Sequence, residues 1–207
     1  SATLGVDGHH ALFTFGCAHR MTRLFQEQWA DGICGLNESP QSLVQVMRAH
    51  HQLQHNTFAI DLREAGSPAL RIGVVPDRNR SWVPMTHKRV SYVVQGSSLR
   101  IGNQVLVGAT EWLVDSGSTF IYVASNQMGA IRRTLGRGCR DQPWTQTLTL
   151  DLGSGVAMTL TPEQYSYSEN GRYCLGIYPG TPATIGLIAM EHRETQFDLG
   201  NQMISFD

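Results

Sequence analysis

The chain has 207 residues, of which 41% are hydrophobic and 16% charged, a composition typical of a folded protein with a sizeable core. Its 16 Lys and Arg residues balance 17 Asp and Glu residues, for a net charge of -1, so charge does not indicate a nucleic acid or membrane surface as a partner. No apolar run approaches the roughly 20 residues that span a bilayer, and the first residues, SATLGVDGHH, lack the basic start and apolar stretch of a signal peptide. Because the sequence also lacks an initiator Met, we expect a fragment or a processed product.

Short apolar or alternating runs follow one another along most of the chain, separated by Gly, Pro, Asn and Asp. In chain order the main runs are ALFTFGC, TFAIDL, ALRIGVV, VSYVVQG, SLRIGNQVLVG, EWLVD, LTLDLGSGVAMTLT, YCLGIY, ATIGLI and TQFDLGNQMISF. Turn residues between runs predict hairpins at 102–103, 153–155 and 200–201. The pattern indicates an all-β fold.

Two segments have the spacing of a helix instead. After Ser39 and Pro40, which suit an N-cap and a first helical position, apolar residues recur three and four apart up to His50. The second helix is predicted from an N-cap at Ser125 through NQMGAIRRTL to Gly136.

The stretch VDSGSTF, which begins at Val114, is the best candidate for an active-site loop. Asp115 follows an apolar strand and opens a turn of small hydroxyl residues and glycine, so hydroxyls and backbone N–H groups are available to orient its carboxylate. Taken alone, however, Asp-Ser-Gly is also a common β-turn.

The surrounding segments favour the catalytic interpretation, because in order they resemble the pepsin-like aspartic peptidases over residues 12–207. VDSGSTF resembles the family's apolar-apolar-Asp-[Ser/Thr]-Gly-[Ser/Thr] signature, and NQMGAIRRTL resembles the short helix that follows it. Other similar segments are FTFGC, ADGICGL, PQSLVQVM, NTFAIDL, LRIG and WVPM upstream, and LTPEQYSYSENGRYCLGIY and ATIGLIAMEHRETQFDLGNQMISF downstream. Phe-Gly-Cys before Asp-Gly-Ile resembles the plant-like branch, which includes the nepenthesin-like peptidases.

The resemblance implies a role for each residue of the loop. Asp115 would be the second-lobe catalytic aspartate, and Ser118 would bond the outer oxygen of its carboxylate. Ser116, where many members have Thr, would join a hydrogen-bonded interlock beneath the two aspartates. Gly117 belongs to the signature, and Thr119 would follow on the wall of the cleft.

The resemblance also assigns supporting residues outside the loop. Gly35 and Gly186 match the glycines of the two psi-loops that support the catalytic loops. Cys139 and Cys174 match the second-lobe disulfide, which would stabilise the fold by about 3 to 4 kcal/mol. The sequence leaves open how the two other cysteines, at positions 17 and 34, are paired.

A second catalytic aspartate is missing from the sequence. Asp151 and Asp198 also stand two residues before a glycine, but each is followed by Leu where a hydroxyl is needed, so turn positions are expected. The Tyr-bearing flap hairpin of the family is absent too. The pair His51 and His55 has helical spacing but lacks the Glu of a zinc peptidase, so no metal site is expected.

We therefore expect the end of a first lobe in residues 1–73 and a complete second lobe in 74–207. The expected function is aspartic endopeptidase cleavage of peptides or proteins, without cofactor, metal or nucleic acid. The isolated chain would be inactive without an N-terminal lobe segment or light chain. The alternatives are a catalytically inactive pepsin-like binding or inhibitory protein, and an unrelated β-rich module that binds carbohydrate or protein. Disulfides and resemblance together indicate the secretory route, with an extracellular or endolysosomal destination.

Overall fold

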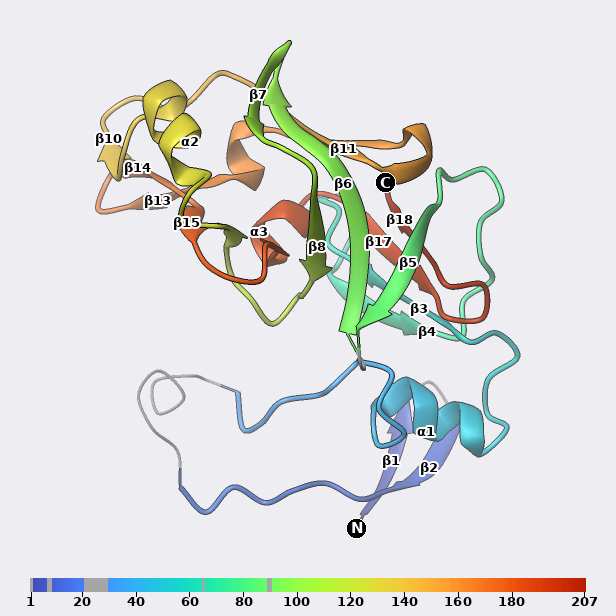
Figure 1. Cartoon of the computed structure of the whole chain (residues 1–207). Helices are drawn as coiled ribbons and strands as arrows, with labels where there is room; N and C mark the ends of the chain where they lie inside the picture. The colour runs from blue at the N-terminus through green and yellow to red at the C-terminus, as the bar shows by residue number, and fades with distance from the viewer. Residues whose placement is uncertain (1, 7–8, 21–29, 65, 89–90) are drawn as a thin grey trace. The chain divides into compact units, whose positions relative to one another are not determined.

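Strands dominate the secondary structure, which confirms the all-β prediction (Figure 1). The computed structural model describes residues 2–6, 9–20, 30–64, 66–88 and 91–207. The strands are β1 (Ala2–Val6), β2 (His9–Phe13), β3 (Thr57–Asp61), β4 (Ala69–Ile72), β5 (Val83–Lys88), β6 (Ser91–Ile101), β7 (Gln104–Val107), β8 (Thr110–Val114), β9 (Ile121–Val123), β10 (Cys139–Arg140), β11 (Leu148–Leu152), β12 (Ala157–Leu160), β13 (Ser166–Glu169), β14 (Arg172–Leu175), β15 (Ile177–Pro179), β16 (Thr184–Ile185), β17 (Glu194–Asp198) and β18 (Met203–Phe206). The helices are α1 (Leu43–Ala49), α2 (Met128–Leu135) and α3 (Leu187–Met190), with 3-10 turns η2 (Gly153–Gly155) and η3 (Pro162–Gln164).

The chain divides into two compact units, residues 1–56 and 57–207. The larger unit begins ahead of the lobe boundary predicted at 73–74, because β3 pairs with both β4 and β17 and so joins the sheet formed by the end of the chain. The lobe boundary itself stays a prediction. No helix in the described part of the chain is long and apolar enough to cross a membrane.

The smaller unit contains one hairpin and one helix. Strands β1 and β2 pair antiparallel, and α1 buries Val44 and Met47. Several large apolar side chains remain exposed in this unit, among them Phe15 and Ile33. The two remaining cysteines, Cys17 and Cys34, are exposed free thiols, so the bond between them that the sequence left open does not form in the structure.

Strand β6 organises the larger unit. It pairs with β5, β7, β8 and β11, and Figure 1 shows it as a long curved strand between β5 and β8. The partner strand β11 has the period-2 burial expected for a sheet, since its three leucines are buried while Thr149 and Asp151 are half-buried. Trp112 of β8 is 1% exposed, and Phe58 stacks on Phe197 with 4.3 Å between ring centroids.

The predicted turns and helices agree with the structure except at the helix starts. Hairpins form at all three predicted turns, between β6 and β7, β11 and β12, and β17 and β18. Helix α1 begins at Leu43, after a turn in which the Ser42 amide donates to the Ser39 carbonyl (2.8 Å), so the start predicted at Ser39 and Pro40 is three residues early. Helix α2 likewise begins after a turn over residues 124–127 and ends, as predicted, at Gly136 with φ 89°. The run ATIGLI is strand only at 184–185 and then turns into α3.

Candidate active site

The main-chain position of Asp115 is set by three strands. Strand β16 lies between β8 and β9, parallel to β8, so the loop that joins β8 to β9 passes around the residues that follow β16. The amides of Leu113 and Asp115 donate to the carbonyls of Ala183 (2.8 Å) and Ile185 (3.0 Å). Asp115 is therefore held at the end of a paired strand and not in a free loop.

The carboxylate of Asp115 receives two hydrogen bonds from its own loop. The Gly117 amide donates to Oδ1 (3.0 Å), and the Ser118 hydroxyl donates to Oδ2 (2.7 Å). The Ser118 amide also donates to the Asp115 carbonyl (3.1 Å), which closes the turn. These donors fix the direction of the half-buried carboxylate.

Gly186 packs inside the turn that carries Asp115. A Cβ at this position would lie 2.1 Å from the Phe120 carbonyl oxygen and 2.7 Å from that of Ser118. The next amide, of Leu187, donates to the same Ser118 oxygen (2.7 Å), and the Ile188 amide donates to the Thr119 oxygen (3.0 Å). The loop that carries Asp115 and the start of α3 thus fit together only if residue 186 has no side chain.

The structure joins some of the predicted site residues through direct contacts. Asp115, Gly117, Ser118 and Gly186 form one contiguous group through the contacts above. Thr119 is exposed, and no hydrogen bond in the described residues joins the Ser116 hydroxyl to the Asp115 carboxylate. The other predicted glycine, at position 35, belongs to the smaller unit.

The remaining aspartates of the Asp-x-Gly type have structural contacts. Asp151 pairs with Arg100 (2.6 Å) and accepts from Ser98, while Asp198 caps the β17–β18 turn by accepting from the Asn201 amide (3.0 Å). Asp198 therefore stabilises the last hairpin turn, as expected. Asp151, which was expected at a turn, lies within β11 instead and its contacts join β11 to β6.

An aromatic cluster adjoins the loop that carries Asp115 and was not singled out from the sequence. Phe120 lies 4.9 Å from the ring of Tyr167 and 5.0 Å from that of Tyr178, and the two tyrosine hydroxyls are 2.9 Å apart. Burial, followed by the bond to Tyr167, raises the pKa of Tyr178 to about 12. Its phenol stays protonated and acts here as a packing group. The sequence shows a series of tyrosines in EQYSYSENGRYCLGIY. Their spacing alone does not predict that two of them, Tyr167 and Tyr178, pack against Phe120.

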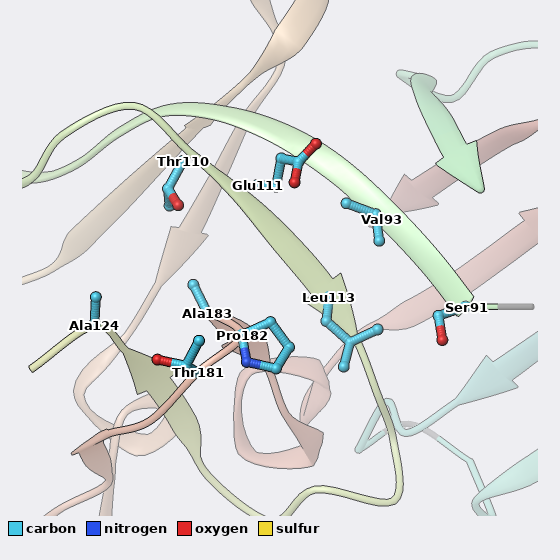
Figure 2. Close-up of a pocket in the computed structure, with 9 residues that line it drawn as sticks. All are labelled: Ser91, Val93, Thr110, Glu111, Leu113, Ala124, Thr181, Pro182 and Ala183. Atoms are coloured by element: carbon cyan, nitrogen blue, oxygen red, sulfur yellow. The ribbon is translucent and has the colours of Figure 1, made fainter. Parts of the chain in front are cut away.

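A pocket of about 370 Å³ opens on the strands that lead to Asp115 (Figure 2). Cross-strand pairing between β6 and β8 places Val93 beside Leu113 on one face, and Leu113 is two residues before Asp115. The lining residues are Ser91, Val93, Thr110, Glu111, Leu113, Ala124, Thr181, Pro182 and Ala183. The same β8–β16 pair therefore carries the carboxylate and part of the pocket wall.

The predicted disulfide between Cys139 and Cys174 is present and joins directly opposed residues of β10 and β14. With Glu169, these cysteines are also the group of metal-ligating atoms found within 4.8 Å in the described part of the chain. Because disulfide sulfurs are not thiolates, this group does not suit a metal. His51 and His55 lie beyond the end of α1, so they do not share the helical face that their spacing suggested.

Comparison with known proteins gives a consistent result. A family model described as "Eukaryotic aspartyl protease" matches residues 3–207. Among solved structures, basic 7S globulin from soybean superposes with a TM-score of 0.69 at 18% identity, covering 84% of this chain and 57% of that chain. The aspartic proteinase from Irpex lacteus gives a TM-score of 0.77 at 15% identity, covering 99% of this chain and 75% of that chain. No curated protein sequence matches. These likenesses confirm the predicted pepsin-like fold.

Proposed function

Because this chain belongs to the eukaryotic aspartyl protease family over residues 3–207, we propose that it supplies the second-lobe aspartate of an aspartic endopeptidase. Asp115 would act with a second aspartate from a separate lobe or light chain. The observation that carries the proposal is the Asp115 carboxylate itself, held at a strand end by the Gly117 amide and the Ser118 hydroxyl.

The chemistry follows the established arrangement of aspartic proteases, in which two close carboxylates share one proton. The ionised carboxylate takes a proton from water as the water oxygen attacks the peptide carbonyl carbon. The protonated carboxyl gives its proton to the carbonyl oxygen, which forms a tetrahedral diol. The nitrogen of the leaving amine is then protonated and the C–N bond breaks.

Each residue of the loop would contribute to holding one carboxylate in place. Ser118 and Gly117 keep the Asp115 oxygens pointing in fixed directions, which lowers the cost of orienting the water. Ser116 would bond across to the partner lobe. Gly186, and by resemblance Gly35 in the first lobe, would let the loops pack without a side chain.

The pocket beside Leu113 would take a substrate side chain. Support comes from its position on the same strand as Asp115 and from its mixed apolar and polar lining. A peptide lying across the carboxylate would place one of its side chains within reach of this pocket, since consecutive residues of an extended chain are about 3.3 Å apart.

The partner and the compartment are part of the same proposal. The sequence contains a single Asp-[Ser/Thr]-Gly, and the chain spans 57% of the length of the soybean protein, so we propose that the active enzyme includes a first lobe from outside residues 1–207. The disulfide supports an oxidising, secretory compartment, extracellular or endolysosomal. The Phe-Gly-Cys segment supports the plant-like branch.

The experiment compares this chain alone with the chain combined with a first lobe, using an extended peptide substrate at acid pH. We expect cleavage only by the combined protein. Asp115→Asn should abolish it, while Asp151→Asn, the matched variant at an aspartate of strand β11, should not. Inhibitor-sensitive cleavage by the chain alone would contradict the need for a partner. Binding of the peptide without cleavage by the combined protein would favour the inactive, binding relative instead.

A further inference from the structure

We propose that arginines at the end of α2 and in the turn to β10 bind an acidic polysaccharide, one whose sugars carry sulfate or carboxylate groups. The site, the arginine cluster, consists of Arg132, Arg133, Arg137 and Arg140. It shares no residue with the loop that carries Asp115, so the inference is independent of the proposed function.

Positive charge is concentrated in this part of the chain. Residues 125–147 contain four arginines and one acidic residue, Asp141, for a formal charge of +3. The net charge of the whole chain is -1, so the other residues together carry -4. The cluster therefore creates a local positive potential that the net charge conceals.

The four arginine side chains are exposed and available to an anion. Within the part of the chain that the structure describes, no carboxylate forms an ion pair with Arg132, Arg133 or Arg137. The Arg140 guanidinium lies over the ring of Trp144, 5.2 Å from its centroid. An anion would thus meet guanidinium groups that do not first have to leave a carboxylate.

The fold holds the turn between α2 and β10 in place. Helix α2 ends at Gly136, whose amide donates to the Arg132 carbonyl (3.1 Å). Gly136 and Gly138, on either side of Arg137, have positive φ angles of 89° and 64°, which glycine adopts without strain. Strand β10 then pairs with β14, and the disulfide fastens that pairing (Figure 1). A turn that is fixed at both ends loses less entropy when a ligand binds.

The loop after β10 returns to the end of α2 and adds uncharged polar groups. The Trp144 indole N–H donates to the Leu135 carbonyl (2.9 Å), which ties this loop to the last turn of the helix. Exposed uncharged polar side chains flank the tryptophan, at Gln142, Thr145, Gln146 and Thr147. Such groups exchange hydrogen bonds with sugar hydroxyls, whereas guanidinium forks bind the oxygens of sulfate or carboxylate in pairs.

The neighbouring acidic groups do not cancel the positive charge. Asp141 pairs with Arg172 of β14 (3.1 Å), an arginine outside the cluster. Glu169 of β13 lies beside the disulfide, 3.8 Å from the Cys174 sulfur. With these residues included, five arginines stand against two carboxylates, so the region stays positive.

The surface suits a polysaccharide better than a protein or a membrane. Trp144 is only 4% exposed, and no large apolar side chain in residues 125–147 is exposed. Protein interfaces and membrane-bound helices both depend on apolar or aromatic anchors. The disulfide is typical of oxidising compartments, where acidic polysaccharides are polyanions that a protein meets.

The test measures binding of the 207-residue chain to dextran sulfate, polygalacturonate and neutral dextran at neutral pH. We expect binding of a charged polymer that weakens as salt is raised, and no binding of neutral dextran. Binding of dextran sulfate alone would identify sulfate as the group recognised, binding of polygalacturonate alone would identify carboxylate, and binding of both would show that either suffices.

Two triple variants separate the cluster from net charge. Replacing Arg132, Arg133 and Arg137 by Gln should weaken binding by about tenfold or more, because three charge contacts are lost. The control replaces three exposed arginines elsewhere by Gln, at Arg20, Arg48 and Arg78. It removes the same charge and should change the affinity by about twofold or less, because distant charges are screened.

Three results would overturn the inference. Failure of both charged polymers to bind the wild-type chain would do so without any variant. Equal losses in the two triple variants would show that net charge, and not the cluster, carries the binding. Tighter binding of polyglutamate than of either polysaccharide would identify an acidic protein segment as the ligand instead.

Discussion

Replacing Gly186 by Ala tests the packing that holds Asp115. The new methyl carbon would stand 2.1 Å from the Phe120 carbonyl oxygen, whereas a carbon and an oxygen in contact are about 3.3 Å apart. Relief of this overlap requires a main-chain displacement of about 1 Å. Such a displacement is costly, because the Leu187 amide donates a hydrogen bond to the neighbouring Ser118 carbonyl (2.7 Å) and so holds the two segments together.

We expect Gly186→Ala to lower the free energy of unfolding by about 3 kcal/mol, the upper end of the range for overpacked sites. For a chain of 207 residues this corresponds to a Tm lower by roughly 6 to 12 °C. Thermal unfolding followed by circular dichroism measures the difference. The control is Gly108→Ala, since a Cβ at Gly108 meets no atom within 4 Å and the substitution should change stability by about 0.5 kcal/mol or less. Equal Tm values for the two variants would refute the packing argument.

Two further predictions concern the disulfide and an ion-pair cluster. Replacing Cys139 and Cys174 by Ser should lower the free energy of unfolding by about 4 kcal/mol, because the disulfide closes a loop with a sequence separation of 35 residues. Unfolding in urea measures the difference. The control is a variant in which the two free cysteines, Cys17 and Cys34, are replaced instead. Asp61→Asn should destabilise the protein by about 1 kcal/mol at neutral pH, since bonds from Arg63 and Arg71 hold the pKa of Asp61 well below its ordinary 3.8. A depressed pKa gives stability that is present above pH 4 and lost as the pH falls further, so wild type and variant should converge in acid; a difference that grows toward low pH would contradict this assignment.

The sequence was sufficient to predict the all-β fold, the three hairpins and many of the strands, because these depend on local pattern. Strands β5 and β9 were not among the predicted runs. Period-2 alternation identifies β11, and Gly200-Asn201 identifies the last turn. The predicted start of α1 was three residues early and that of α2 two residues early, because a Ser before a helix suits a preceding turn as well as an N-cap.

Features that depend on the meeting of distant segments could not be predicted in the same way. Nothing near Gly186 in the sequence shows that Phe120 and Ser118 surround it; only the insertion of β16 between β8 and β9 does so. The facing of Glu111 into a pocket similarly depends on the register of β8 with β6. The resemblance to the pepsin-like peptidases identified Gly186 as a supporting residue, but it did not identify the atoms that surround it.

The most direct test of the central claim is the cleavage rate of the combined two-lobe protein carrying Asp115→Asn. If Asp115 is one of the two catalytic carboxylates, the rate should fall by about 10³-fold or more, while the Tm stays within a few degrees of wild type and Asp151→Asn keeps its activity. Undiminished cleavage by a folded Asp115→Asn protein would contradict the assignment of this loop as the active site.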